Sequence, residues 1–173
     1  KAAHAQPEAL LAAMLDDLAH WRDRLGPRTI HSVHFGGGTP SLMEPAAIAA
    51  ILERADALFG LTPGCEIGLE ANPMEHDRFA GIASAGVERM SLGVQALDDA
   101  SLKRLGRDHD ARTGLRALES AQSLFQRVSL DLIYAREQQT PEDWCTELET
   151  ALSFGTGHMS LYQLTIEPGT AFE

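Results

Sequence analysis

Residues 36–39, Gly-Gly-Gly-Thr, follow an alternating apolar stretch and lead directly into Pro40. Glycine has no Cβ, so the backbone N–H and C=O groups of such a run can come close to a bound molecule. The hydroxyl of Thr39 adds a further hydrogen-bonding group. A tight turn between a strand and a helix explains the same residues equally well, so this motif alone leaves both interpretations open.

Three charged residues further along the chain have the chemistry to bind a small polar molecule. Glu70 and Asp131 carry carboxylates, which are strong acceptors for the N–H groups of an amine or for ribose hydroxyls. Arg107 carries a guanidinium that can hold a carboxylate through two parallel hydrogen bonds. Together with the glycine run, these groups suit a zwitterionic molecule that contains a ribose.

The pattern of apolar residues predicts that strands and helices alternate along the chain. Strands are expected at 29–35, 65–73, 87–95, 127–135 and 158–169, and helices at 8–25, 45–59, 75–85, 98–105, 110–125 and 140–154. Such alternation is typical of a parallel sheet wrapped by helices. No linker or low-complexity tract divides the chain, so we expect residues 1–173 to form one α/β domain.

Each expected strand finishes on polar or glycine residues, although a buried parallel strand is usually apolar along its length. These residues are Gly36–Thr39, Glu70 with Asn72, Gln95, Asp131, and Gln163 with Thr165. In β/α folds the carboxyl ends of the strands gather at one rim, where ligands bind. The five strands therefore predict one shared ligand site at that rim.

Composition excludes several classes of protein. A formal charge of −11 and the lack of any Lys/Arg-rich run argue against nucleic-acid binding. No apolar stretch approaches the roughly 18 residues of a membrane span, and no signal peptide is recognisable. The only cysteines, Cys65 and Cys145, lie too far apart in the sequence to suggest a disulfide framework or a metal-ligand cluster. We therefore expect a cytoplasmic protein without a metal site of its own in these residues.

Six stretches of the sequence, in this order, resemble the radical SAM superfamily and specifically its oxygen-independent coproporphyrinogen III oxidase-like branch. They are VHFGGGTPSL, IGLEANP, GVERMSLGVQALDDASLKRLGRDH, SLDLIY, QTPEDW and SLYQLTIEPGTAF. The resemblance covers nearly the whole chain from residue 30 onward. It implies a partial (β/α)6, TIM-like barrel that is open on one side, with its site at the carboxyl ends of the strands.

The resemblance also implies which residues bind S-adenosylmethionine (SAM). Gly37, Gly38 and Thr39 are similar to the family segment that contacts the amino and carboxylate end of SAM. Glu70 matches the family glutamate near the adenosyl group. Further SAM contacts match Gln95, Arg107 and Asp131, with Arg107 on the methionine carboxylate. No catalytic residue is assigned.

Several family features lie outside these 173 residues. The CxxxCxxC loop that holds the family's [4Fe–4S] cluster is expected before residue 1, together with the first barrel strand, and a C-terminal domain is expected after residue 173. Neither Cys65 nor Cys145 replaces the loop, so we expect these residues alone to perform no radical chemistry. Without its family neighbour, strand 29–35 is expected to be an exposed edge, and a homodimer through that edge is an expectation. The segment AREQQT (135–140) replaces a family Gly-Leu-Pro turn, so its conformation is open.

The resemblance leaves two functions open, and the residues alone leave a third. The first is an oxidoreductase-type enzyme of porphyrin metabolism. In it an electron donor reduces the cluster, SAM is cleaved, and the resulting radical abstracts hydrogen from a porphyrinogen. The alternative is a haem chaperone of the same family, to whose subgroup SLYQLTIEPGT is more similar. The third is a β/α-barrel enzyme unrelated to SAM with a phosphorylated substrate, which the acidic rim disfavours.

Overall fold

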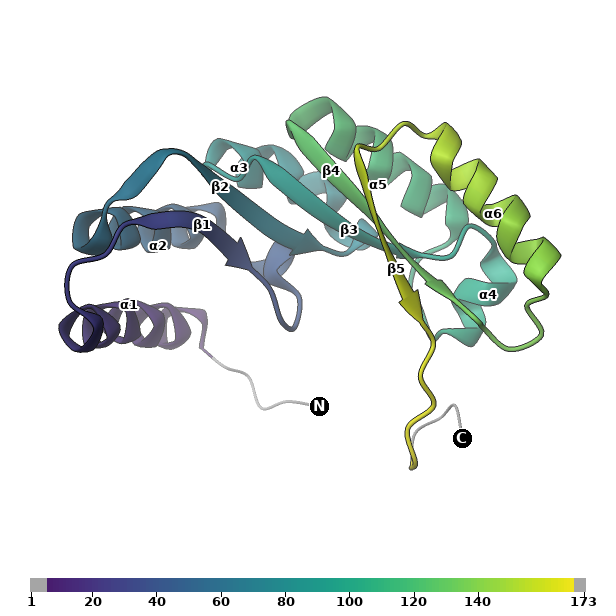
Figure 1. The fold of residues 1–173 in the computed structure, drawn as a ribbon, viewed down its shortest axis with the longest axis horizontal. Coiled ribbons are helices and arrows are strands. Elements are labelled where there is room, and N and C mark those ends of the chain that lie inside the picture. The colour runs from purple at the N-terminus through teal and green to yellow at the C-terminus, as the bar shows by residue number, and fades with distance from the viewer. Residues whose placement is uncertain (1–5, 170–173) are drawn as a thin grey trace.

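Five parallel strands form one curved sheet in the order in which they occur in the sequence (Figure 1). The structure is a computed structural model that describes residues 6–169, so residues 170–172 of the SLYQLTIEPGTAF stretch lie outside it. The strands are β1 (Ile30–Phe35), β2 (Leu61–Ala71), β3 (Arg89–Gln95), β4 (Arg127–Tyr134) and β5 (His158–Gln163). Each pairs in parallel with the next, which confirms the α/β fold with a partial barrel that the sequence predicts.

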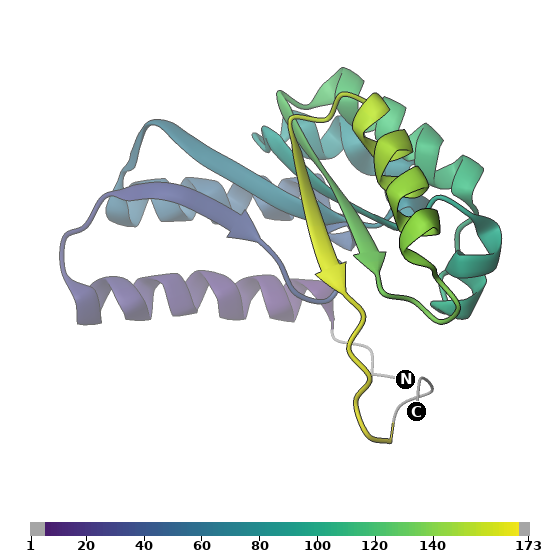
Figure 2. The same cartoon turned by 45° about the vertical axis from the view of Figure 1, so that its right-hand side comes forward.

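Helices connect the strands and line up along one side of the sheet in both views (Figures 1 and 2). They are α1 (Pro7–Leu25), α2 (Pro45–Phe59), α3 (Phe79–Ser84), α4 (Asp99–Arg104), α5 (Ala111–Leu124) and α6 (Pro141–Ser153), with two short 3-10 turns, η1 (Pro40–Leu42) and η2 (Pro73–Arg78). All six predicted helices are present, and the end of the segment expected at 75–85 is the short α3.

Three helices begin where a side chain satisfies a free backbone N–H group. Asp98, Asp110 and Thr140 accept hydrogen bonds from the backbone N–H three residues later, at 2.8, 2.7 and 3.1 Å. In the other direction, the Thr140 backbone N–H donates to the Asp143 carboxylate, which completes a capping box. The hydrogen bond from Thr140 holds the pKa of the Asp143 carboxyl below its usual value. These local signals fix the helix starts that the sequence predicts.

The apolar core lies between the sheet and the helices. Alternate residues of the central strands point into it, because successive side chains of a strand face opposite sides. Leu69, Met90, Leu92, Leu130 and Leu132 are fully buried there and pack with Ile48, Phe79 and Leu118 from the helices. This packing leaves the other residues of each strand to face the inner, concave side of the sheet.

Strand boundaries differ from the sequence prediction in ways that matter for the site. β4 runs from Arg127 to Tyr134, close to the predicted 127–135, but Asp131 lies in the middle of this strand and not at its end, where it was expected. β5 ends at Gln163, well before the predicted residue 169. Polar residues mark the inner face of these strands as much as their ends, and a pattern of single polar residues does not distinguish the two positions.

β1 forms one end of the sheet and, among the described residues, pairs only with β2. This agrees with the predicted edge, while the homodimer through it stays a prediction. Residues 6–169 contain no helix long and apolar enough to cross a membrane.

Candidate functional site

A pocket of about 240 Å³ lies against the inner face of the sheet. Six of the seven predicted SAM-binding residues line it: Gly38, Thr39, Glu70, Gln95, Arg107 and Asp131. The seventh, Gly37, is outside the lining, but its backbone N–H donates to Glu70 Oε2 at 3.2 Å. Five further residues line the pocket and were not assigned to the site from the sequence: Pro40, Ala71, Ser91, Gly93 and Tyr162. The structure therefore brings the seven predicted SAM-binding residues together, whereas Gln163 and Thr165, which were also expected at the rim, do not line the pocket.

The glycine run serves both as a tight turn and as a close approach. Gly37 and Gly38 have φ of 80° and 64°, in the left-handed region that favours glycine. Gly36 has no such φ, but a Cβ there would lie 3.1 Å from Glu70 Oε1 and 3.3 Å from the His34 ring. The first glycine thus makes room for a neighbouring carboxylate, and the next two allow the chain to turn from β1 into η1.

Side chains from η2 fix the end of the glycine segment. Ser41 is fully buried, accepts a hydrogen bond from the Asn72 backbone N–H at 3.3 Å and donates to Glu75 at 3.4 Å. Burial raises the pKa of the Glu75 carboxyl, and the hydrogen bond from Ser41 partly offsets this. Arg78 donates to the carbonyl oxygens of Leu42 and Met43. The backbone that follows Thr39 is therefore held from the neighbouring connection.

Glu70 is oriented by two groups from the β1 side. The His34 ring nitrogen Nε2 lies 3.2 Å from Glu70 Oε1, while Gly37 N–H occupies Oε2. Both side chains are about half exposed, at 48% each. A half-exposed carboxylate with remaining lone pairs can accept hydrogen bonds from a ligand amine or hydroxyl. His34, to which sequence reasoning gave no place in the site, orients this group.

Asp131 lies deeper and is surrounded by hydroxyl groups. The Ser91 hydroxyl lies 3.0 and 2.9 Å from its two carboxylate oxygens, and the Ser129 hydroxyl donates to Oδ1 at 3.2 Å. Asp131 is only 7% exposed. Burial raises the pKa of its carboxyl, hydrogen bonds from the nearby serines oppose that rise, and the charge of Glu70 adds to it.

Gln95, at the end of β3, and Arg107, in a loop, complete the pocket. Gln95 ends β3 with φ of 73°, a rare value for a residue with a side chain. Its amide lies close over Gly93, where a Cβ would be 2.8 Å from Nε2. Arg107 is exposed and follows Gly106 in the turn between α4 and α5. Its guanidinium can therefore reach a ligand carboxylate without first breaking a buried ion pair.

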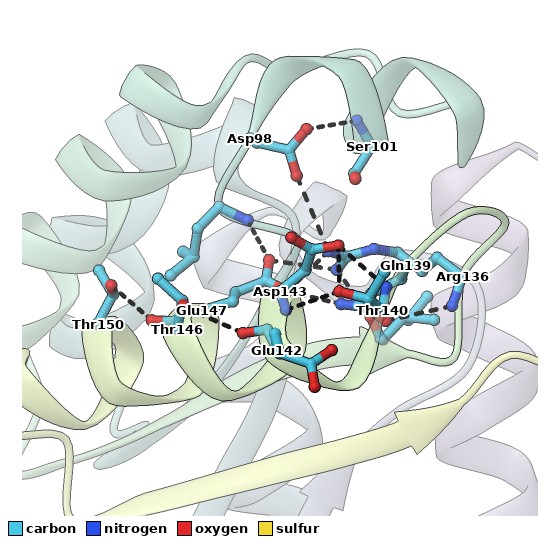
Figure 3. Close-up of polar contacts among 12 residues, drawn as sticks. Asp98, Ser101, Arg136, Gln139, Thr140, Glu142, Asp143, Thr146, Glu147 and Thr150 are labelled. Carbon is cyan, nitrogen blue, oxygen red and sulfur yellow. Dashed lines mark hydrogen bonds and ion pairs between the residues drawn. The ribbon is translucent and has the colours of Figure 1, made fainter.

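The AREQQT segment, whose conformation the sequence left open, folds back onto α6 (Figure 3). Ala135 and Gln138 take positive φ of 58° and 62°. Between them Arg136 is buried and reaches Glu147 on α6, with Nη2 to Oε2 at 2.7 Å. Glu147 also accepts a hydrogen bond from Gln139 at 3.1 Å. A buried ion pair thus takes the place of the family turn beside the rim.

Comparison with known proteins identifies the family. Residues 11–151 match the Radical SAM superfamily. The chain belongs to the radical SAM superfamily. This assignment removes the alternative of a β/α-barrel enzyme unrelated to SAM.

Named relatives and solved structures place the chain within that family. It is 46% identical over 149 residues to the mouse protein "radical S-adenosyl methionine domain-containing protein 1, mitochondrial", covering 84% of this chain and 34% of the relative. It is 40% identical over 166 residues to the heme chaperone HemW of Haemophilus influenzae, covering 94% and 43%. The structure of the Escherichia coli coproporphyrinogen III oxidase HemN superposes with a TM-score of 0.81 at 26% identity, covering 94% and 38%. The chain spans less than half the length of each of these proteins.

Radical SAM family membership implies two cofactors, SAM and a [4Fe–4S] cluster. The pocket residues fit SAM, since they offer an exposed guanidinium, two carboxylates and a glycine-lined backbone. The cluster finds no matching ligands among residues 6–169, where no three His, Cys, Asp or Glu side chains group to hold a metal. Cys65 is buried in β2, where burial raises the pKa of its thiol, and Cys145 is exposed on α6. Neither cysteine supplies a cluster site.

Proposed function

We propose that the inner-face pocket binds SAM and that the complete protein is a haem chaperone of the HemW type. The observation that carries the SAM site is the convergence of Glu70, Gln95, Arg107 and Asp131 on one pocket, from four separate connections and strands. The half-barrel acts as the scaffold that holds these groups at fixed positions.

Each group in the pocket has a distinct task toward SAM. Arg107 meets the methionine carboxylate, and the backbone at Gly38 together with Thr39 binds the amino-acid end of the ligand. Glu70 and Asp131 accept hydrogen bonds from the amine or from ribose hydroxyls. SAM, when bound beside a cluster and given an electron, supplies the reductive cleavage chemistry of the family. The residues described here bind and orient the molecule.

Haem handling is supported by the similarity to HemW, which is higher than the similarity to the oxidase. Identity to the heme chaperone HemW is 40%, whereas identity to the HemN oxidase is 26%. The SLYQLTIEPGT stretch, which includes β5 and the pocket residue Tyr162, points the same way. The partners are therefore haem, an acceptor of haem and an electron donor for the cluster. Both cysteines are free, in keeping with a reducing compartment.

The second candidate is the decarboxylating oxidase, which the fold similarity to HemN supports. One experiment separates the two functions. Full-length protein, purified without oxygen, is titrated with haem and, separately, given coproporphyrinogen III with SAM and a reductant, with the E. coli oxidase as the positive control. Haem binding at one molecule per chain without decarboxylated product supports the chaperone. SAM-dependent decarboxylation would replace it with the oxidase.

A further inference from the structure

A row of side chains on the inner face of β4 and β5 connects the ligand pocket with a second cavity. The parallel register places Ser129 beside His158 and Asp131 beside Ser160. Asp131 lines the ligand pocket. His158 lines a separate cavity of about 690 Å³ near the amino ends of the strands. Ser129 lies between them and is completely buried.

Hydrogen bonds join these three residues into one chain. The Ser129 hydroxyl lies 3.2 Å from Asp131 Oδ1 and 2.9 Å from His158 Nδ1. A hydroxyl has one proton, so when Ser129 donates to the Asp131 carboxylate, His158 Nδ1 must carry the proton and donate to Ser129. Ser160 Oγ, 3.2 Å from Ser129 Oγ, is a second hydroxyl beside the same link.

We propose that Asp131 exchanges its proton with solvent through Ser129 and His158, from the end of the barrel opposite to the ligand. A ligand seated in the pocket covers Asp131 on the pocket side, because that residue is 7% exposed and forms part of the lining. His158 is exposed, so the hydrogen-bonded row of Asp131, Ser129 and His158 reaches water at its His158 end. The inference deepens the proposed SAM site, but its geometry holds for any occupant of the pocket.

The transfer balances in protons. His158 takes a proton from water at Nε2 and gives its Nδ1 proton to Ser129. At the same time Ser129 gives its hydroxyl proton to Asp131. Serine and histidine end with unchanged charge, histidine as the other tautomer, and Asp131 becomes neutral. The reverse sequence returns the proton to water.

The charged groups around Asp131 favour such exchange. Glu70 faces it from β2, and its negative charge, with burial as the larger cause, raises the pKa of the Asp131 carboxyl. Arg107 and Tyr162 share the pocket with it from the α4–α5 loop and β5. At the far end, Arg127 on β4 is paired with Glu66 at 2.7 Å, and Arg89 on β3 contacts the same carboxylate at 3.4 Å. The ion pairs occupy those cations, so neither neutralises Asp131.

Water in an empty pocket can reach Asp131 directly, so proton uptake is measured with SAM bound. The nuclear magnetic resonance readout described below needs no ligand, so it stays informative even if SAM does not bind. A proton is released by photolysis of a caged acid in a solution of full-length protein. The rise of the infrared C=O band of protonated Asp131 is then followed, and the band is assigned by its absence in Asp131→Asn. With SAM bound, we expect His158→Ala and Ser129→Ala each to slow this rise about tenfold or more, and added imidazole to restore the rate in His158→Ala. The control His31→Ala, an exposed histidine on β1, should match the wild type.

Nuclear magnetic resonance of the His158 ring provides a second readout. In wild-type protein at a pH where the ring is neutral, we expect the Nδ1–H tautomer. The Ser129 hydroxyl gives its only proton to Asp131, so the contact with His158 requires Nδ1–H as the donor. Ser129→Ala should return the ring to the Nε2–H tautomer. An unchanged protonation rate in SAM-bound His158→Ala, or an Nε2–H tautomer in the wild type, would overturn the proposal.

Discussion

The backbone N–H of Leu97 donates a hydrogen bond of 2.8 Å to the Glu147 carboxylate, across 50 positions of sequence. Leu97 lies two residues after Gln95, so a side chain on α6 holds the loop that leaves the ligand pocket. Glu147 is 9% exposed, and its buried ion-pair partner Arg136 is 6% exposed (Figure 3). One carboxylate therefore ties the loops after β3 and β4 together at the rim.

Replacing Glu147 should strongly destabilise the protein. Glu147→Ala removes the closer carboxylate of the buried Arg136 guanidinium and leaves only Asp98, at 3.8 Å, which costs about 3–5 kcal/mol of unfolding free energy. Urea unfolding of full-length protein measures the change. The matched control Glu149→Ala, an exposed residue on the same helix, should change stability by about 0.5 kcal/mol at most. Equal, small effects of both substitutions would show that the Arg136–Glu147 pair is not a structural anchor.

Alanine in the glycine segment should separate the two roles of that segment. Gly37→Ala places a side chain at φ of 80°, so we expect a loss of about 1–2 kcal/mol in thermal unfolding. The Cβ added by Gly36→Ala would lie close to the end of the half-exposed Glu70 side chain, which can move aside. We therefore expect weaker SAM binding with little change in the free energy of unfolding. Gly157→Ala is the control, because its φ is ordinary and no atom lies within 4 Å of the added Cβ. A larger loss of stability at Gly36 than at Gly37 would contradict this assignment.

Asp131→Asn should alter how stability depends on pH. Burial raises the folded pKa of this carboxyl above its unfolded value of 3.8, so its ionised form destabilises the folded state. This penalty is fully present above the raised pKa and disappears as pH falls through the window between the two values. We expect the asparagine variant to be more stable than wild type at neutral pH, with a difference that shrinks on acidification. Urea midpoints at several pH values measure this, and a difference that grows on acidification would disprove it.

Local sequence signals predict much of the fold. Helix caps such as Asp98 and Thr140, and the alternation of strands with helices, depend on neighbouring residues alone. The pocket was also predictable, because strand ends of a parallel sheet gather at one rim. The inner face of β3 also has a period-two signal in the sequence, because Ser91, Gly93 and Gln95 alternate with the buried Met90, Leu92 and Val94. That alternation marks a polar inner face beyond the strand ends.

Contacts between distant elements could not be predicted from the sequence. The meeting of Ser129 with His158 depends on the register of β4 against β5, and a shift by one residue would turn either side chain to the other face. The Arg136–Glu147 ion pair depends equally on how α6 packs against the loop after β4. A single sequence contains no direct record of such registers.

The most direct test of the SAM site is calorimetric titration of SAM into full-length protein and its Arg107→Ala variant, with urea melts of both. Arg107 is exposed, so its removal should leave the melting midpoint unchanged, while loss of a charge-assisted contact of about 1.5–3 kcal/mol weakens affinity roughly ten- to hundredfold. Arg112→Ala, an exposed arginine in the first turn of α5, serves as the control and should bind SAM like the wild type. Equal SAM affinity in wild type and Arg107→Ala would contradict the assignment of this pocket.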